Sequence, residues 1–149
     1  MSSANAPERP AEESADLRDE WLGRLTTLVD QVEGWAKELG WFTRRIDKKL
    51  RDSEIGSYLA VALLMQKDTT PVLLEPVARS APGADGVVDL YLMPTYDDIA
   101  SLYYYGGEWN LHSLSHDQKA VATIREADSK PLSKDALNEV LEEMRQHAA

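Results

Sequence analysis

The chain of 149 residues contains no cysteine, which excludes disulfides, thiolate nucleophiles and cysteine-based metal sites. It also contains only three histidines and one phenylalanine. The longest apolar run, from Leu59 to Met65, is far shorter than the roughly 20 residues that a transmembrane helix requires. A chain without cysteine is compatible with a reducing compartment, so we predict a cytoplasmic protein that does not span a membrane.

Basic residues are scarce: 16 lysines and arginines stand against 26 acidic residues, and the formal net charge is −10. A molecule with this charge repels nucleic acids and anionic membranes on average. Binding to a polyanion would therefore require a local basic patch. The balance favours another protein as the partner, and it argues against nucleic acid and against a membrane surface.

The first residues, "MSSANAPERPAEES", lack the basic start and the apolar core of a secretory signal. They are rich in Pro, Ala, Ser and Glu, and they bury too little apolar surface to offset the entropy lost on ordering. We predict a disordered tail over residues 1–14. The rest of the chain, residues 15–149, has the size and the apolar content of a single domain.

Apolar residues recur at steps of three and four between Leu17 and Leu39, as in an amphipathic helix. Ser14 or Asp16 can cap its start and Gly40 its end. This spacing has two explanations: the helix packs on a sheet, which we favour, or it pairs with a second copy in a homodimer. The stripe consists of Leu17, Trp21, Leu25, Leu28, Val32, Trp35 and Leu39.

The next segment, "WFTRRIDKKLRDSEIG", carries a basic patch of Arg44, Arg45, Lys48, Lys49 and Arg51. Its apolar residues recur every four positions, which suits a short helix, but the segment could equally lead into a strand. Its state stays open. The patch either contacts an acidic partner or a phosphate, or it neutralises neighbouring carboxylates of the protein itself.

After Gly56 the pattern becomes that of β-strands. The runs "SYLAVALLMQ" and "PVLLEPVAR" predict a hairpin, and the prolines indicate a strand start and a bulge or edge. The run "VVDLYLMP" alternates between two faces. In "TYDDIA", the pair Asp97 and Asp98 opens a turn or caps a helical turn before two further strands in 101–112.

At the C-terminal end, Ser115 and Gln118 form a capping-box pattern before "HDQKAVATIREA", and Ser133 can cap "KDALNEVLEEMRQ". We therefore predict an α+β fold with two-layer packing. It combines a long N-terminal helix, a central, mostly antiparallel sheet of about five strands, and two C-terminal helices.

The stretch "SLYYYGGEWNLH" reads as a hairpin around Gly106-Gly107. With a two-residue loop, Tyr104 faces Trp109 and both point to the core. A three-residue loop shifts the pairing by one residue. We favour the two-residue loop because it separates polar from apolar side chains better.

In that register Tyr103 and Tyr105 share a semi-polar face with His112, beside Asp89 and Tyr91 from the neighbouring strand. Rigid tyrosines with hydrogen-bonding tips make peptide-binding patches. The alternative is that helices cover this face. We predict a small acidic protein-binding module, comparable with adaptors, chaperones or immunity proteins and homodimeric, whose partner-binding residues are Tyr91, Tyr103, Tyr105 and His112.

Signals of catalysis are weak. Asp47 and Lys49 form the Asp-x-Lys fragment of metal-dependent nucleases, which also need a second carboxylate, such as Glu75 or Asp89. A metal-dependent hydrolase or nuclease is therefore the alternative function.

The spacing of His112 and His116 suits a metal site only on one helix, and we place His112 at a strand end. No Ser-His-Asp order and no glycine-rich phosphate loop stands out. We predict a binding protein rather than an enzyme, with no metal or other cofactor.

Overall fold

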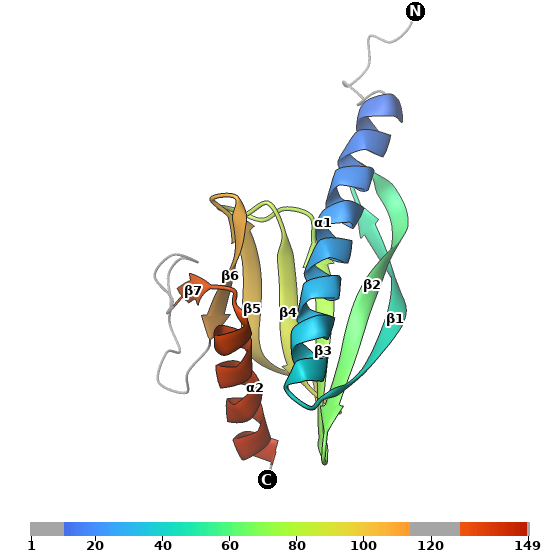
Figure 1. Cartoon of the computed structure of the whole chain (residues 1–149). Helices are drawn as coiled ribbons and strands as arrows, with labels where there is room; N and C mark the ends of the chain where they lie inside the picture. Colours follow the sequence, from blue (N-terminus) through green and yellow to red (C-terminus); the bar gives the residue numbers. More distant parts are fainter. Residues whose placement is uncertain (1–10, 114–128, 149) are drawn as a thin grey trace, which may run out of the picture.

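A computed structural model describes residues 11–113 and 129–148 of the chain. Within these ranges the chain forms two helices and seven strands (Figure 1). In chain order they are α1 (Ala11–Glu38), β1 (Phe42–Asp52), β2 (Gly56–Lys67), β3 (Thr70–Ala78), β4 (Val87–Leu92), β5 (Asp97–Tyr105), β6 (Glu108–Ser113), β7 (Ser129–Pro131) and α2 (Lys134–Ala148).

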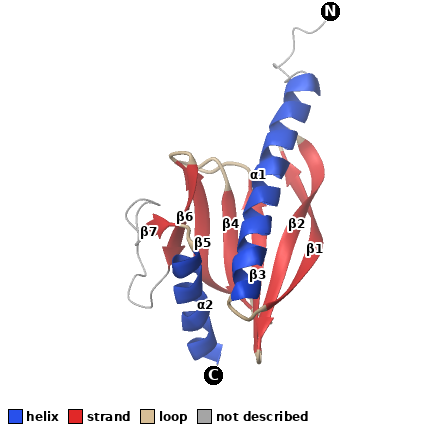
Figure 2. Ribbon diagram, in the orientation of Figure 1, coloured by secondary structure: helices blue, strands red, loops and turns tan. Residues whose placement is uncertain are grey.

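The strands form one sheet in the order β1 to β7, each antiparallel to the next. Both helices lie on the same face of this sheet, which gives two layers (Figure 2). The α+β class with an antiparallel sheet is thus confirmed. The sheet has seven strands rather than about five, because segment 42–52 and segment 129–131 also pair into it.

Strand pairing decides the structure of two segments, the basic segment and the segment that contains Asp97. The basic segment is strand β1, which pairs with β2 from Phe42 to Asp52. Asp97 begins β5 instead of opening a turn, because it pairs with Leu92 of β4. In both cases hydrogen bonding to a neighbouring strand decides a state that the local residues leave open.

The helix ends follow their capping signals. Gly40 has a φ of 90° after α1, and the Ser133 hydroxyl accepts a hydrogen bond from the Ala136 amide at 3.0 Å. Helix α1 begins at Ala11, so residues 11–14 are helical and not part of a tail. The remainder of the predicted tail, residues 1–10, lies outside the described residues, and so does the predicted helix "HDQKAVATIREA". Within the described residues, α2 is the one helix after the sheet.

The apolar stripe of α1 packs on the sheet. Its central residues have almost no exposed surface, and they share one core with the inner face of the strands. Because its own chain covers this stripe, the stripe does not offer a coiled-coil seam to a second copy. The buried residues of α1 are Trp21, Leu25, Leu28, Val29, Val32 and Ala36.

Strand β2 separates from β3 partway along its length. Their pairing ends at Leu63. Tyr58 and Leu63 are an odd number of residues apart, yet both point into the core, so the alternation of buried and exposed side chains changes phase between them. At the separated end, the Trp21 indole donates a hydrogen bond to the Tyr58 hydroxyl at 2.8 Å. Pro76, which has no amide hydrogen to donate, lies at a bulge of β3 beyond this pairing, as the prolines predicted.

Neither described helix is both long enough and apolar enough to cross a membrane.

Candidate binding surfaces

The hairpin of β5 and β6 has the register that the sequence favours. Tyr105 pairs with Glu108 and Tyr104 with Trp109. Gly106 and Gly107 have φ values of 64° and 80°, which are the left-handed conformations of a type I′ two-residue loop. The pleat therefore places Tyr103 and Tyr105 on the face of the sheet that carries no described helix, and Tyr104 and Trp109 on the helix side.

On the helix-free face, Tyr103 and Tyr105 enclose His112. The Tyr105 hydroxyl lies 3.1 Å from His112 Nε2, and the Tyr103 ring meets the imidazole edge to face with ring centres 4.8 Å apart. His112 is only 3% exposed, and its Nδ1 atom has no hydrogen-bond partner among the described residues. Burial lowers the pKa of His112 below its ordinary 6.5, so the ring is neutral at pH 7.

A polar row crosses the same face. Glu75, Asp89, Ser101 and His112 are successive cross-strand partners. The Asp89 carboxylate accepts hydrogen bonds from the Tyr91 hydroxyl at 2.8 Å and from the Ser101 hydroxyl at 2.7 Å. Ser101 thus donates to the aspartate, whereas a hydrolytic triad needs a histidine between the serine and the aspartate.

The four predicted partner-binding residues, Tyr91, Tyr103, Tyr105 and His112, all lie on this helix-free face. They form two groups: Tyr91 joins Asp89 and the ring of Tyr96, 5.4 Å away, and the others form the histidine cluster. The Tyr91 hydroxyl is bonded to Asp89 and the Tyr105 hydroxyl lies within hydrogen-bond distance of His112, so internal contacts already occupy part of the polar surface of this face.

The residues of the predicted nuclease site do not meet. Asp47 and Lys49 alternate with Lys48 along β1 and so point to its other side, while the Lys48 ammonium lies 2.9 Å from the Glu75 carboxylate. In residues 11–113 and 129–148, no three His, Asp or Glu side chains form a group able to hold a metal ion. His116 lies outside the described residues.

The basic patch is divided between two roles. Arg45 reaches α1, where its guanidinium lies 2.6 Å from Asp30 and 2.9 Å from Glu33. The hydrogen bond from Arg45 lowers the pKa of Glu33. Arg45 and Lys48 therefore neutralise carboxylates of the protein itself. The other three cations of the patch are exposed and have no ion pair within the described part of the chain: Arg44, Lys49 and Arg51.

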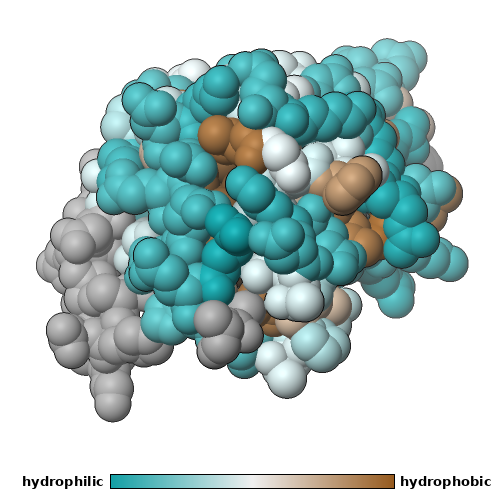
Figure 3. Space-filling view, turned by 60° about the horizontal axis from the view of Figure 1, so that its bottom comes forward, coloured by the Kyte–Doolittle hydropathy of each residue, from teal (hydrophilic) through white to brown (hydrophobic). Residues whose placement is uncertain are grey.

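Exposed apolar side chains accompany these cations on the ribbon of β1 and β2. Phe42 is 83% exposed, Leu59 60% and Ile46 37%. Figure 3 shows that apolar surface forms separate patches among mostly hydrophilic residues at one end of the molecule. The sequence alone did not indicate this exposure, because apolar side chains in a strand or helix are expected on its buried side.

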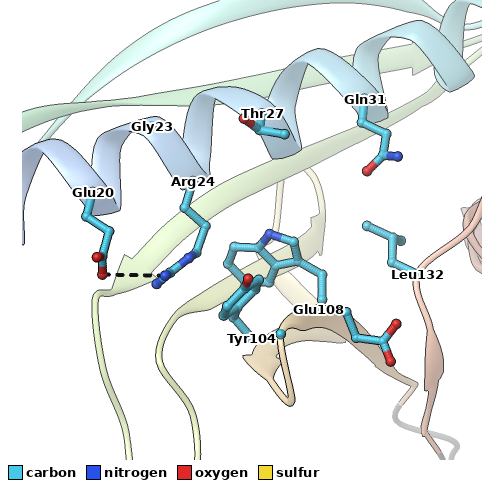
Figure 4. Close-up of a pocket in the computed structure, with 10 residues that line it drawn as sticks. Glu20, Gly23, Arg24, Thr27, Gln31, Tyr104, Glu108 and Leu132 are labelled. Atoms are coloured by element: carbon cyan, nitrogen blue, oxygen red, sulfur yellow. Dashed lines mark ion pairs between the residues drawn. The ribbon is translucent and has the colours of Figure 1, made fainter.

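A groove of about 550 Å³ lies between α1 and the hairpin of β5 and β6 (Figure 4). Its aromatic wall is the pair Tyr104 and Trp109, whose rings meet at a steep angle with centres 5.2 Å apart. The Arg24 guanidinium lies 4.1 Å above the centre of the Tyr104 ring. The prediction that Tyr104 and Trp109 are core residues is therefore wrong in part: both are half-buried and line a groove.

Comparison of the chain with protein-family models, with curated proteins and with solved structures found no match.

Proposed function

We propose that this protein is a binding module that holds an extended, acidic segment of a partner protein against the outer edge of β1. The observation that carries the proposal is a long strand at the end of the sheet, with an exposed phenylalanine and three cations that have no ion pair within residues 11–113 and 129–148.

The backbone of β1 supplies the first argument. The strand has 11 residues, about twice the usual length of 5–6. It pairs with β2 on one side, and no described strand pairs with its other side. An exposed edge of this length presents a row of free amide and carbonyl groups, on which a partner strand adds by main-chain hydrogen bonds.

The side chains of β1 supply the second argument. Phe42 and Ile46 are four residues apart, and side chains two or four apart in a strand share a face. Both are exposed, so an added strand could cover them and gain from burial of apolar surface. At 83% exposure, Phe42 is an aromatic anchor of the type that dominates binding energy at interfaces.

Charge selects the partner. Arg44, Lys49 and Arg51 create a positive edge on a protein of net charge −10. An acidic segment is attracted to this edge, while a basic segment is repelled. A second copy of the chain pairing through β1 would bring two positively charged edges together, which is less favourable than pairing with an acidic segment. We therefore propose a different protein as the occupant of this edge, and not a homodimer formed through it.

The test starts from a displayed library of random peptides of about 12 residues, selected on the wild-type chain. We expect sequences rich in Asp and Glu with alternating apolar residues. Fluorescence anisotropy then gives the affinity of a selected peptide for the Arg44→Glu, Arg51→Glu double variant, which we expect to be at least about tenfold lower because two favourable charge contacts become repulsive.

A matched control carries Arg18→Glu and Lys130→Glu, which change the net charge equally at exposed positions away from β1. This control should keep the wild-type affinity apart from a small general charge effect. Selection of peptides without acidic residues, or equal loss in both double variants, would contradict an edge site on β1.

The helix-free face remains a second predicted surface. Substituting Tyr103 and Tyr105 together by Ala tests it with the same peptide. An unchanged affinity would confine the site to the edge, whereas a loss would extend the bound segment across the sheet toward His112.

A further inference from the structure

The groove between α1 and the hairpin has the chemistry of a site for a positively charged side chain. We infer that it binds a lysine or arginine side chain of a partner protein, with the cation over the indole of Trp109 and close to the carboxylate of Glu108. This site is separate from the β1 edge in the sheet order and in the charge that it selects.

The chain already binds one cation on this hairpin. The Arg24 guanidinium lies 4.1 Å above the centre of the Tyr104 ring, and it also donates a hydrogen bond to the Asp85 carbonyl at 2.9 Å. Glu20 lies 3.5 Å from it and balances its charge. Arg24 is therefore held by three internal contacts, and it does not act as a free cation for an incoming anion.

Trp109 is the neighbouring ring, and the structure places no cation on it among the described residues. Tryptophan is the aromatic side chain that attracts cations most strongly. Its indole is half-buried, with Tyr104 on one side and the Trp21 ring centre 6.4 Å away. Packing by two aromatic neighbours holds the ring in place, so a ligand does not have to order it.

Negative charge lies next to this ring. Glu108 is exposed, lines the groove and forms no ion pair within the described ranges of the chain. Figure 4 shows its carboxylate on the Leu132 side of the groove, away from the pair of Arg24 and Glu20. Thr27 and Gln31 of α1 add hydrogen-bonding groups opposite the hairpin. The groove thus offers an aromatic face, an exposed carboxylate and neutral polar groups, a combination that favours a cation.

The volume of about 550 Å³ falls within the range of ligand pockets, roughly 300–1,000 Å³. A lysine or arginine side chain with its flanking backbone fits such a space. The overall charge of −10 also attracts basic segments from a distance.

The experiment uses the full-length ¹⁵N-labelled chain and follows the indole N–H signal of Trp109 by NMR, assigned by its absence in Trp109→Phe. The probes are acetyl-Gly-Arg-Gly-amide and acetyl-Gly-Lys-Gly-amide. Two further tripeptides replace the basic residue with citrulline, which keeps the shape of arginine without its charge, or with glutamate. We expect a saturable shift with the basic probes and at least a fivefold weaker effect with the other two, about the change expected for a lost cation contact.

Two surface variants complete the test. Glu108→Gln should weaken binding of the arginine probe about fivefold, while the hairpin amide signals stay at their wild-type positions. Glu12→Gln, which removes one exposed carboxylate from the start of α1, should leave binding unchanged. Equal binding of citrulline and arginine, no saturable shift, or full binding by Glu108→Gln would overturn the inference. None of these results bears on the edge of β1.

Discussion

Gly86 is the position where a single methyl group should disturb the core most clearly. A Cβ atom on this residue would lie 2.7 Å from Cζ3 of Trp21 and 3.1 Å from Cη2 of Trp109. Trp21 is 1% exposed, and its indole donates a hydrogen bond to the Tyr58 hydroxyl at 2.8 Å. The ring therefore cannot retreat without loss of packing and of this bond.

The expected cost of Gly86→Ala follows from these contacts. Overpacking a core by one methyl group destabilises by about 1–3 kcal/mol, and a weakened buried hydrogen bond adds about 1 kcal/mol. We expect the free energy of unfolding to fall by about 2–4 kcal/mol, which is a large part of the 5–15 kcal/mol typical of a domain. Urea denaturation followed by far-UV circular dichroism measures this change.

The matched control is Gly34→Ala, the same substitution on α1, where nothing lies within 4 Å of the added Cβ. Alanine is the better helix former, so this variant should gain about 0.5–1 kcal/mol. In a Trp21→Phe background the smaller ring leaves room, and Gly86→Ala should cost less there. If Gly86→Ala were as stable as the wild type, the close approach of Trp21 to this backbone would be refuted.

Three further predictions concern stability. Gly107→Val should destabilise the hairpin by about 1–2 kcal/mol because φ is positive there, whereas Gly106→Asn should be nearly neutral, as thermal melting would show. Burial lowers the pKa of His112, so the unfolded chain takes up a proton at a higher pH than the folded chain does. The free energy of unfolding should therefore decrease as the pH falls below about 6.5, and this decrease should be smaller in His112→Gln. Arg79→Met should cost about 1.5–3 kcal/mol in urea denaturation, since it removes a hydrogen-bonded ion pair to Asp52 in which both side chains are only 14% exposed.

Each of these has a contrary outcome. Equal melting temperatures for Gly107→Val and the wild type would argue against the type I′ loop. A pH profile unchanged in His112→Gln would mean that the imidazole is not a buried neutral group. For Asp52, burial raises the pKa, but hydrogen bonds from the Glu54 amide and from Arg79 outweigh it, so the net pKa lies below 3.8. Its stabilisation is therefore present above that pH and lost in stronger acid, and an acid dependence unchanged in Arg79→Met would contradict the pairing.

The elements with local signals were predictable. The ends of the described helices at Gly40 and Ser133 depend on residues within a few positions, and so does the loop at Gly106 and Gly107. The same holds for the alternation of β4. In each case the conformation is decided by sterics or hydrogen bonds within a turn or two of the chain.

The candidate surfaces were predictable only in part. The residues Tyr91, Tyr103, Tyr105 and His112 share a face because strand alternation requires it, given the register. That Ser101 bonds to Asp89, and that Lys48 reaches Glu75, depends on which strands are neighbours. The groove at Tyr104 and Trp109 was missed because its other wall, α1, is about 80 residues away along the chain.

By itself, the amino-acid sequence determined the α+β class, the amphipathic α1, the register of the last hairpin and the acidic charge, since these depend on composition and on contacts between residues close in the chain. Only the tertiary structure decided that segment 42–52 is an edge strand, because its four-residue spacing suits a helix equally well and pairing with β2 makes the difference. The structure also decided which aromatic rings are covered and which line a groove. That outcome depends on the position of α1 over the sheet, where packing between distant segments outweighs local preference.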